Sequence, residues 1–341
     1  MHVIVVTPLI RGTQLESLSY FSSVPYEIGS FVQVPIRGKT QSAIVTNVRA
    51  AHASKTALKA ASFSLRKLPQ QPGARALPAG LRETAEMLAN QYPATTGSII
   101  YQLLPPDVRN GSRPYPECGE GEQSEDTAPQ LLTARTDERH ITYQSLVRTQ
   151  FAKKHSVTMV VPTAAYIANS VANMSNGIKD HVITLSPMMT KAARDKAYAA
   201  IEDTTHAKLI ITTPAYAYIE RADCSTIIVE HSGSSHYVAR TRPYLDHREG
   251  LKAFAKACGR QIILGDTVPS TEDEYKRRED IYNTYDEPAK RMAFPAPLSI
   301  IFQKDKAKPD IPFVLFSDEL KNSVKRALEG RGRVFLFAAR R

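Results

Sequence analysis

The chain has 341 residues, 42% of them hydrophobic, and it carries a formal net charge of +10 with a pI of about 9.4. This length and composition exclude a disordered chain and predict at least two globular domains. The positive charge favours a polyanionic partner, first of all nucleic acid, although a basic surface without a partner gives the same number.

Cysteine usage and hydropathy indicate the cellular compartment of the protein. The three cysteines, Cys118, Cys224 and Cys258, are far apart and form no Cys-x-x-Cys pair, which argues against a zinc site or a disulfide framework. No apolar run is long enough to cross a membrane, and the opening "MHVIVVTPLIRG" is typical of a first β-strand. The sequence therefore predicts a cytoplasmic protein without a membrane partner.

The first part of the chain is predicted to be β-rich. The runs "HVIVVTPL", "SFVQVPI" and "SAIVTNV" are β-branched and bounded by Gly, Pro and Ser. Apolar residues at helical spacing then predict helices over residues 81–92 and 96–104, which Pro93 and Pro105 terminate. Residues 110–128 are rich in Gly, Pro, Ser and Glu, which is typical of a linker.

Beyond the linker, the pattern predicts a mainly parallel sheet. Apolar runs such as "VTMVVP", "KLIITTP" and "QIILGD" alternate with expected helices at 143–154, 164–174, 189–202 and 248–257. Near-continuous apolar runs are typical of parallel strands that helices cover on both faces. The run "LSIIF", a helix in "SDELKNSVKRALEG" and a strand "RVFLFA" then predict the start of a second α/β unit.

The strand "TIIVEH" ends where a nucleotide-hydrolysing α/β protein would carry the acidic pair that holds magnesium. An ATP-hydrolysing site needs a Gly-rich loop with Lys and Ser or Thr, and an acidic pair for magnesium and water. Here Glu230 is followed by His231, and the segment before the first helix, "TARTDERHITYQSL", contains no Gly and no Lys. Two parts of one site are thus altered, which predicts that ATP hydrolysis is lost or very weak.

The order of these motifs resembles the first motor lobe of superfamily 2 helicases, and more narrowly the primosomal protein N-prime family, the PriA replication-restart helicases. The ends "VVPT", "TLSP", "ITTPA", "IIVEHSGSSHY" and "ILGDTVPS" follow one another as the family's motifs do. The matching positions in and between the last two are Tyr237, Pro243, Arg248, Leu264, Gly265, Pro269 and Ser270. The resemblance makes Glu230, His231 and Gly265 positions of a degenerate nucleotide site.

The N-terminal segment resembles the same family's amino-terminal domain, which binds the 3′ end of a DNA strand at a fork. The residues that carry this similarity are Leu18, Ser19, Tyr20, Gly29, Val32, Val34, Pro35 and Lys39. The resemblance implies stacking by Tyr20 or Phe21 and phosphate contacts by Arg37 and Lys39. Core aromatics and a basic hairpin explain these residues equally well, and Ser19 replaces the family's acidic contact to the 3′ hydroxyl.

A loop after the altered strand is a second candidate DNA contact. Tyr237, Arg240, Arg242 and Tyr244 interleave aromatic and basic side chains. Such residues can stack on bases and hold phosphates. The resemblance places the corresponding family loop near DNA.

The resemblance implies an α/β fold in four parts: a β-rich DNA-binding domain, a linker, a RecA-like lobe and the start of a second lobe. Their expected ranges are 1–109, 110–139, 140–285 and 286–341. The function expected is that of a DNA-binding factor in replication restart, acting on forks or 3′ ends with restart proteins as partners. It would need no cofactor, since ATP and magnesium belong only to the alternative of an active, divergent 3′–5′ helicase. A protein-interaction scaffold is the remaining alternative.

Overall fold

The structure is a computed structural model with two compact units, Met1–Ala289 and Lys290–Arg341. It describes residues 1–12, 15–50, 65–68, 75–116, 128–285 and 316–337. Two features expected from the sequence, the strand in "LSIIF" and the thiol of Cys118, lie outside the described residues.

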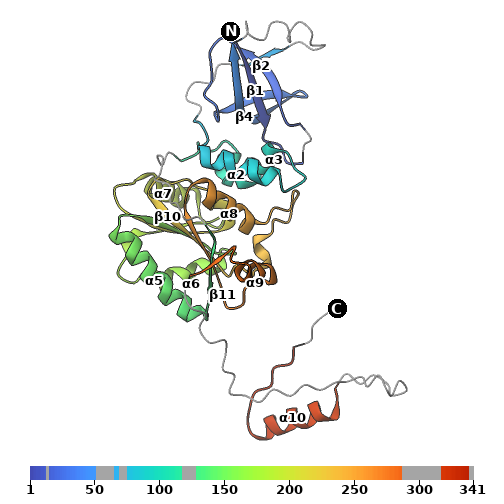
Figure 1. The fold of residues 1–341 in the computed structure, drawn as a ribbon, viewed down its shortest axis with the longest axis vertical. Coiled ribbons are helices and arrows are strands. Elements are labelled where there is room, and N and C mark those ends of the chain that lie inside the picture. The colour runs from blue at the N-terminus through green and yellow to red at the C-terminus, as the bar shows by residue number, and fades with distance from the viewer. Residues whose placement is uncertain (13–14, 51–64, 69–74, 117–127, 286–315, 338–341) are drawn as a thin grey trace, which may run out of the picture. The chain divides into compact units, whose positions relative to one another are not determined.

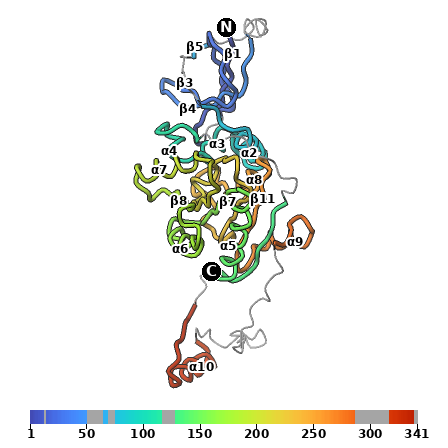
Figure 2. Tube along the Cα trace, turned by 90° about the vertical axis from the view of Figure 1, so that its left-hand side faces the viewer, coloured from blue at the N-terminus to red at the C-terminus, as the bar shows by residue number. Residues whose placement is uncertain are grey.

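The N-terminal strands form a curled sheet with its own core. The strands are β1 (His2–Pro8), β2 (Leu18–Ser22), β3 (Phe31–Ile36), β4 (Lys39–Ala50) and β5 (Arg66–Lys67). Their order is β3-β4-β1-β2-β5, with only the β2–β5 pair parallel (Figures 1 and 2). Alternate residues such as Ile4, Val34 and Val45 are buried in one cluster, as the alternation of "FVQVPI" predicted.

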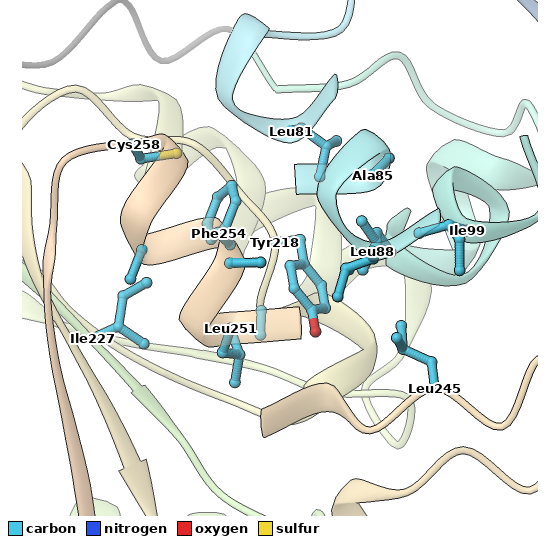
Figure 3. Close-up of a cluster of buried hydrophobic side chains, with 14 of the residues drawn as sticks. Leu81, Ala85, Leu88, Ile99, Tyr218, Ile227, Leu245, Leu251, Phe254 and Cys258 are labelled. Atoms are coloured by element: carbon cyan, nitrogen blue, oxygen red, sulfur yellow. The ribbon is translucent and has the colours of Figure 1, made fainter. Parts of the chain in front are cut away.

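Three helices follow this sheet, and two of them confirm the spacing of the apolar residues. They are α2 (Ala79–Ala89), α3 (Thr96–Leu103) and α4 (Pro106–Arg109). The Thr95 side chain accepts a hydrogen bond from the backbone N–H of Ser98 at 3.2 Å, and this cap starts α3. Leu81, Ala85 and Leu88 of α2 are buried and belong to one cluster with residues of the second sheet's helices (Figure 3).

The second sheet is parallel and has strands in the order β12-β6-β11-β10-β7-β9-β8. The strands are β6 (Gln130–Thr133), β7 (Ser156–Val160), β8 (Val182–Leu185), β9 (Leu209–Thr212), β10 (Cys224–Glu230), β11 (Gln261–Asp266) and β12 (Asn283–Thr284). The α-helices between them are α5 (Thr136–Ala152), α6 (Ala165–Met174), α7 (Lys191–Glu202), α8 (His247–Ala257) and α9 (Thr271–Arg278). Three short 3₁₀ turns are η2 (Lys179–His181), η3 (Pro214–Tyr216) and η4 (Ser235–Tyr237).

Helices cover both faces of this sheet. Ile227 and Val229 of β10 pack in the cluster that holds Leu251 and Phe254 of α8 (Figure 3). Ile228, between them in sequence, packs in the cluster of α5 and α6. The near-continuous apolar strands are therefore buried on both faces, as predicted, and the fold is α/β, with a β-rich N-terminal domain and a lobe built on the parallel sheet.

Two expectations about elements were wrong. The range 110–139, expected as linker, contains β6 and the start of α5, so the lobe begins at Gln130. The strand expected in "RVFLFA" is absent over residues 332–337, where the backbone is irregular and the apolar side chains are exposed. The described residues offer this segment no neighbouring strand, and a strand forms only with a hydrogen-bonded partner. The helix before it, α10 (Asp318–Glu329), is confirmed with its Ser317 cap.

Within the described residues, no helix combines the length and apolar character that a membrane span requires.

The buried His247 at the start of α8 makes folding sensitive to acid. Its Nδ1 lies 3.0 Å from the hydroxyl of Tyr218, and burial lowers its pKa from the usual 6.5 to about 4, against a smaller opposing effect of Asp246. The His247 ring binds a proton near pH 6.5 in the unfolded chain, but only near pH 4 in the folded chain. The stability from the neutral ring is therefore complete above pH 6.5 and is lost as pH falls toward 4.

We expect His247 to lower the free energy of unfolding by about 2 kcal/mol between pH 7 and pH 5. The His247→Gln variant, which cannot titrate, should lose correspondingly less over this interval in urea denaturation. A His236→Gln variant, altered at an exposed histidine, serves as the control and should follow the wild type. Parallel pH profiles for the wild type and His247→Gln would contradict the assignment.

Candidate functional site

The three expected nucleotide-site positions lie together at the carboxyl end of the parallel sheet. Glu230 ends β10 and is paired in register with Gly265 of β11. His231 follows directly, with its Nε2 3.6 Å from a carboxylate oxygen of Glu230. Ligands of open parallel sheets bind at this edge. These three positions therefore lie next to one another at the edge of the sheet, which is where the strand pattern of the sequence placed them.

A buried ion pair occupies the centre of this site. The Arg139 guanidinium donates to both oxygens of Glu230, from Nη2 at 2.6 Å and from Nε at 3.1 Å. The two side chains are 0% and 1% exposed, respectively. The remaining nitrogen of Arg139, Nη1, donates to the carbonyl oxygen of Ala134 at 2.6 Å and to Thr267 Oγ1 at 3.1 Å. This bidentate geometry is stronger than a single hydrogen bond between a guanidinium and a carboxylate.

Tyr143 completes the set of donors to the carboxylate. Its hydroxyl donates to Glu230 Oε2 at 2.8 Å, and burial raises the pKa of this phenol well above its usual value. A Cβ on Gly265 would overlap the Tyr143 hydroxyl, so the glycine is required for the tyrosine to reach Glu230. Glu230 thus accepts three hydrogen bonds from side chains of α5, which satisfies a buried carboxylate.

Sequence reasoning missed Arg139 and Tyr143. A usable signal was present: they share one helical stripe with Leu146 and Val147, and all four side chains are buried. A charged residue on such an apolar stripe needs a buried counter-charge. Glu230, at the end of an apolar strand, is the residue of the opposite sign.

The connection that would hold phosphates is very short. β6 ends at Thr133 and α5 begins at Thr136, so that only Ala134 and Arg135 lie between them. The Gly-x-x-x-x-Gly-Lys-Ser/Thr pattern spans about eight residues, whose N–H groups surround the phosphates. Here Glu138 accepts a hydrogen bond from the N–H of Arg135 at 3.1 Å, which ties one of the few donors to the helix itself.

Magnesium nucleotide does not fit the residues at this strand end. Glu230, at the position expected to face magnesium, is saturated by hydrogen bonds from Arg139 and Tyr143, and the guanidinium lies beside it. The two-residue connection offers neither a lysine nor a glycine-rich backbone. Within the described part of the chain, no group of three or more His, Cys, Asp or Glu side chains is arranged to hold a metal ion.

The loop after β10 is anchored beside the Arg139–Glu230 pair by Tyr237. The expectation that Tyr237 contacts DNA was therefore wrong. The Tyr237 side chain is fully buried, and its hydroxyl lies 2.8 Å and 2.7 Å from the carbonyl oxygens of Val160 and Glu230. A ring in this position anchors the loop and cannot stack on a base. Arg240 and Arg242 are exposed, as expected, and Tyr244 is 56% exposed.

Strand β2 places Leu18, Ser19 and Tyr20, the three adjacent residues expected to contact DNA, on two opposite faces of the sheet. Leu18 and Tyr20 face the core, where Tyr20 is 4% exposed and its hydroxyl donates to the carbonyl oxygen of Pro35 at 3.1 Å. Ser19 points to the other face and is exposed. A stacking role for Tyr20 is therefore wrong for this conformation, because strand geometry places adjacent side chains on opposite faces.

Gly29 and the hairpin residues lie elsewhere on the same sheet. Gly29 is buried with a φ of 93°, and its N–H donates to the carbonyl oxygen of Val45 at 2.7 Å. Its role in the structure is to shape the backbone at the start of β3, since few residues other than glycine adopt this φ. Arg37 and Lys39 are exposed at the turn between β3 and β4.

The exposed face of the N-terminal sheet carries residues that sequence reasoning did not single out. Reading across the sheet, Arg49 of β4, Val3 of β1, Phe21 of β2 and Lys67 of β5 are paired in one row. Arg49 and Lys67 are exposed, Val3 is buried, and Phe21 is half-buried and belongs to no core cluster. Ser19 lies on the same face, two residues from Phe21. An aromatic ring between two cations is suited to stacking a base between phosphate contacts.

We expect the Arg139–Glu230 pair to contribute strongly to stability. Arg139→Met and Glu230→Gln should each lower the free energy of unfolding by about 3–5 kcal/mol, because each leaves a buried group without its partner. The double variant should lose clearly less than the sum of the two. Glu272→Gln, which alters the exposed pair with Lys276, is the control and should cost less than about 1 kcal/mol. Small, additive losses in urea denaturation would show that the pair is not formed.

Comparisons with known proteins return likenesses of fold only. No protein-family model matches the chain, and no curated protein matches it. The helicase domain of Pyrococcus furiosus Hef aligns with 51% of this chain and 38% of its own, at 13% identity and a TM-score of 0.35. The UvsW helicase of bacteriophage T4 aligns with 76% of this chain and 96% of its own, at 8% identity and a TM-score of 0.34. An arterivirus nonstructural protein 10 helicase, solved with DNA, aligns with 74% of this chain and 44% of its own, at 12% identity and a TM-score of 0.27. The chain thus spans less than half the length of two of the three solved chains.

Proposed function

We propose that this protein is a DNA-binding factor of replication restart, similar to primosomal protein N-prime, that recognises forked or 3′-ended DNA and does not hydrolyse ATP. It would act in the cytoplasm with other restart proteins. The motif order in the sequence supports the family, and the α/β fold with a β-rich N-terminal domain is compatible with it.

The observation that carries the DNA-binding part is the row of side chains on the exposed face of the N-terminal sheet. Phe21 lies next to Lys67, the buried Val3 separates it from Arg49, and Ser19 lies beside it on the same face. A terminal base can stack on Phe21 while the two cations contact phosphates. The Ser19 hydroxyl can hydrogen-bond to a 3′ hydroxyl, more weakly than a carboxylate would.

The closed strand-end site supports the loss of ATP hydrolysis. The Arg139–Glu230 pair is inaccessible to solvent, and the connection between β6 and α5 consists of two residues. Binding a nucleotide there would require breaking a buried ion pair, which costs several kcal/mol. A divergent active helicase would need its phosphate site elsewhere in the chain.

DNA binding is tested by fluorescence anisotropy with a labelled fork whose leading-strand end carries either a 3′ hydroxyl or a 3′ phosphate. We expect binding that weakens with salt and with the 3′ phosphate. Arg49→Gln and Lys67→Gln should each weaken it several-fold and lower the salt slope by about 1, as the loss of one phosphate contact does. Lys191→Gln, at an exposed cation on α7, is the control. Absence of binding to either fork at moderate salt would overturn the proposal and favour a protein-interaction scaffold.

Nucleotide binding is tested by thermal denaturation and by phosphate release. A ligand at about 100 times its Kd stabilises a fold by about 2.7 kcal/mol, which a melting curve detects readily. We expect no shift with magnesium ATP and no DNA-stimulated phosphate release. DNA-stimulated phosphate release by the wild type would establish the divergent helicase instead.

A further inference from the structure

Two asparagines of the chain are each followed by a glycine, at Asn110–Gly111 and at Asn176–Gly177. All four residues are exposed. A glycine has no Cβ to shield its backbone nitrogen, and a Cβ built on Gly111 or on Gly177 would meet no atom of the described residues within 4 Å. In both pairs the nitrogen of the glycine is therefore sterically free to approach the side-chain amide of the asparagine. Sequence and exposure do not distinguish the two pairs.

Backbone hydrogen bonds hold the first pair at the end of α4. The N–H of Asn110 donates to the carbonyl oxygen of Pro106 at 3.0 Å. The N–H of Gly111 donates to the carbonyl oxygen of Val108, also at 3.0 Å. The glycine nitrogen of this pair is therefore already engaged in a hydrogen bond.

The second pair forms a tight turn between α6 and η2. The N–H of Ile178 donates to the carbonyl oxygen of Ser175 at 3.0 Å, which makes Asn176 and Gly177 the two central residues of the turn. Gly177 has a φ of 79°, as the third residue of a type II turn requires. Among the described residues, the N–H of Gly177 has no hydrogen-bond acceptor. This nitrogen, unlike that of Gly111, is left to solvent.

We propose that Asn176 is a site of spontaneous deamidation and that the fold protects Asn110 from the same reaction. Solvent base removes the proton of the Gly177 nitrogen, and the nitrogen attacks Cγ of Asn176. The new C–N bond closes a five-membered succinimide ring, while the bond from Cγ to Nδ2 breaks and ammonia leaves. Water then opens the ring at one of its two carbonyl carbons, which leaves an aspartate or an isoaspartate at position 176. No electrons are gained or lost.

The modification would change the turn that leads to the edge strand β8. Both products add a negative charge, and isoaspartate also inserts the former Cβ into the main chain. The longer main chain strains the hydrogen bond between Ile178 and Ser175 that closes the turn. Because Ile178 packs against the cluster of α5 and α6, we expect the packing at the end of α6 to loosen. This inference does not depend on the proposed DNA binding.

The test follows both asparagines of the whole chain by peptide mass spectrometry. The folded protein is incubated at mildly alkaline pH and digested at mildly acidic pH, where the reaction stops. Asn176 should exchange its NH₂ for OH at least about 5-fold faster than Asn110, since the Gly111 nitrogen must first lose one net hydrogen bond. In urea, which removes the turn and the hydrogen bond to Val108, the two asparagines should react at similar rates.

A variant and a second measurement complete the test. Asn176→Gln would have to close a less favoured six-membered ring, so position 176 should stay unmodified while the rate at Asn110 is unchanged. Hydrogen exchange also begins with loss of the amide proton, so the N–H of Gly177 should exchange faster than that of Gly111. The inference is overturned if Asn176 reacts no faster than Asn110 in the folded protein, or stays intact there while both react in urea.

Discussion

The edge of the parallel sheet at the carboxyl ends of its strands depends on the ion pair between Arg139 and Glu230. The pair joins α5 to β10 in the interior, where an unpaired charge would be very costly. Gly265 leaves the space that Tyr143 needs, and Tyr237 fixes the next loop to the backbone of Glu230 itself. The edge at which open parallel sheets bind their ligands is thus filled by the chain's own side chains.

This arrangement has a consequence for the loop that follows β10. The N–H of Gly233 donates to Asp266 at 2.7 Å, and Arg248 donates to the carbonyl oxygen of Ser232 at 2.9 Å while it pairs with Asp246. Both ends of the loop are therefore anchored, and its exposed residues, Arg242 and Tyr244, lie between the two anchors. Because a rigid surface loses little entropy on binding, such a loop favours a ligand that it meets without rearrangement.

Much of the fold was predictable from the sequence, because apolar runs and helical spacing report burial directly. β6 was missed, since "QLLT" offers only two apolar residues next to a polar segment. The site was harder to predict. Alternation shows that Tyr20 and Phe21 lie on opposite faces, but the partner strands decide which face is inside. Likewise, Tyr237 and Tyr244 look equivalent in the sequence, and only the packing of the loop on Val160 and Glu230 distinguishes a core residue from an exposed one.

The burial of the Arg139–Glu230 pair also separates two responses to ionic strength. Mobile ions screen charges that they can surround, and they cannot enter a pair that is 0% and 1% exposed. The cations on the N-terminal sheet and in the loop after β10, in contrast, are open to solvent. Salt therefore weakens the interactions of these exposed cations with any anion, while the buried pair keeps its strength and the edge of the lobe keeps its shape.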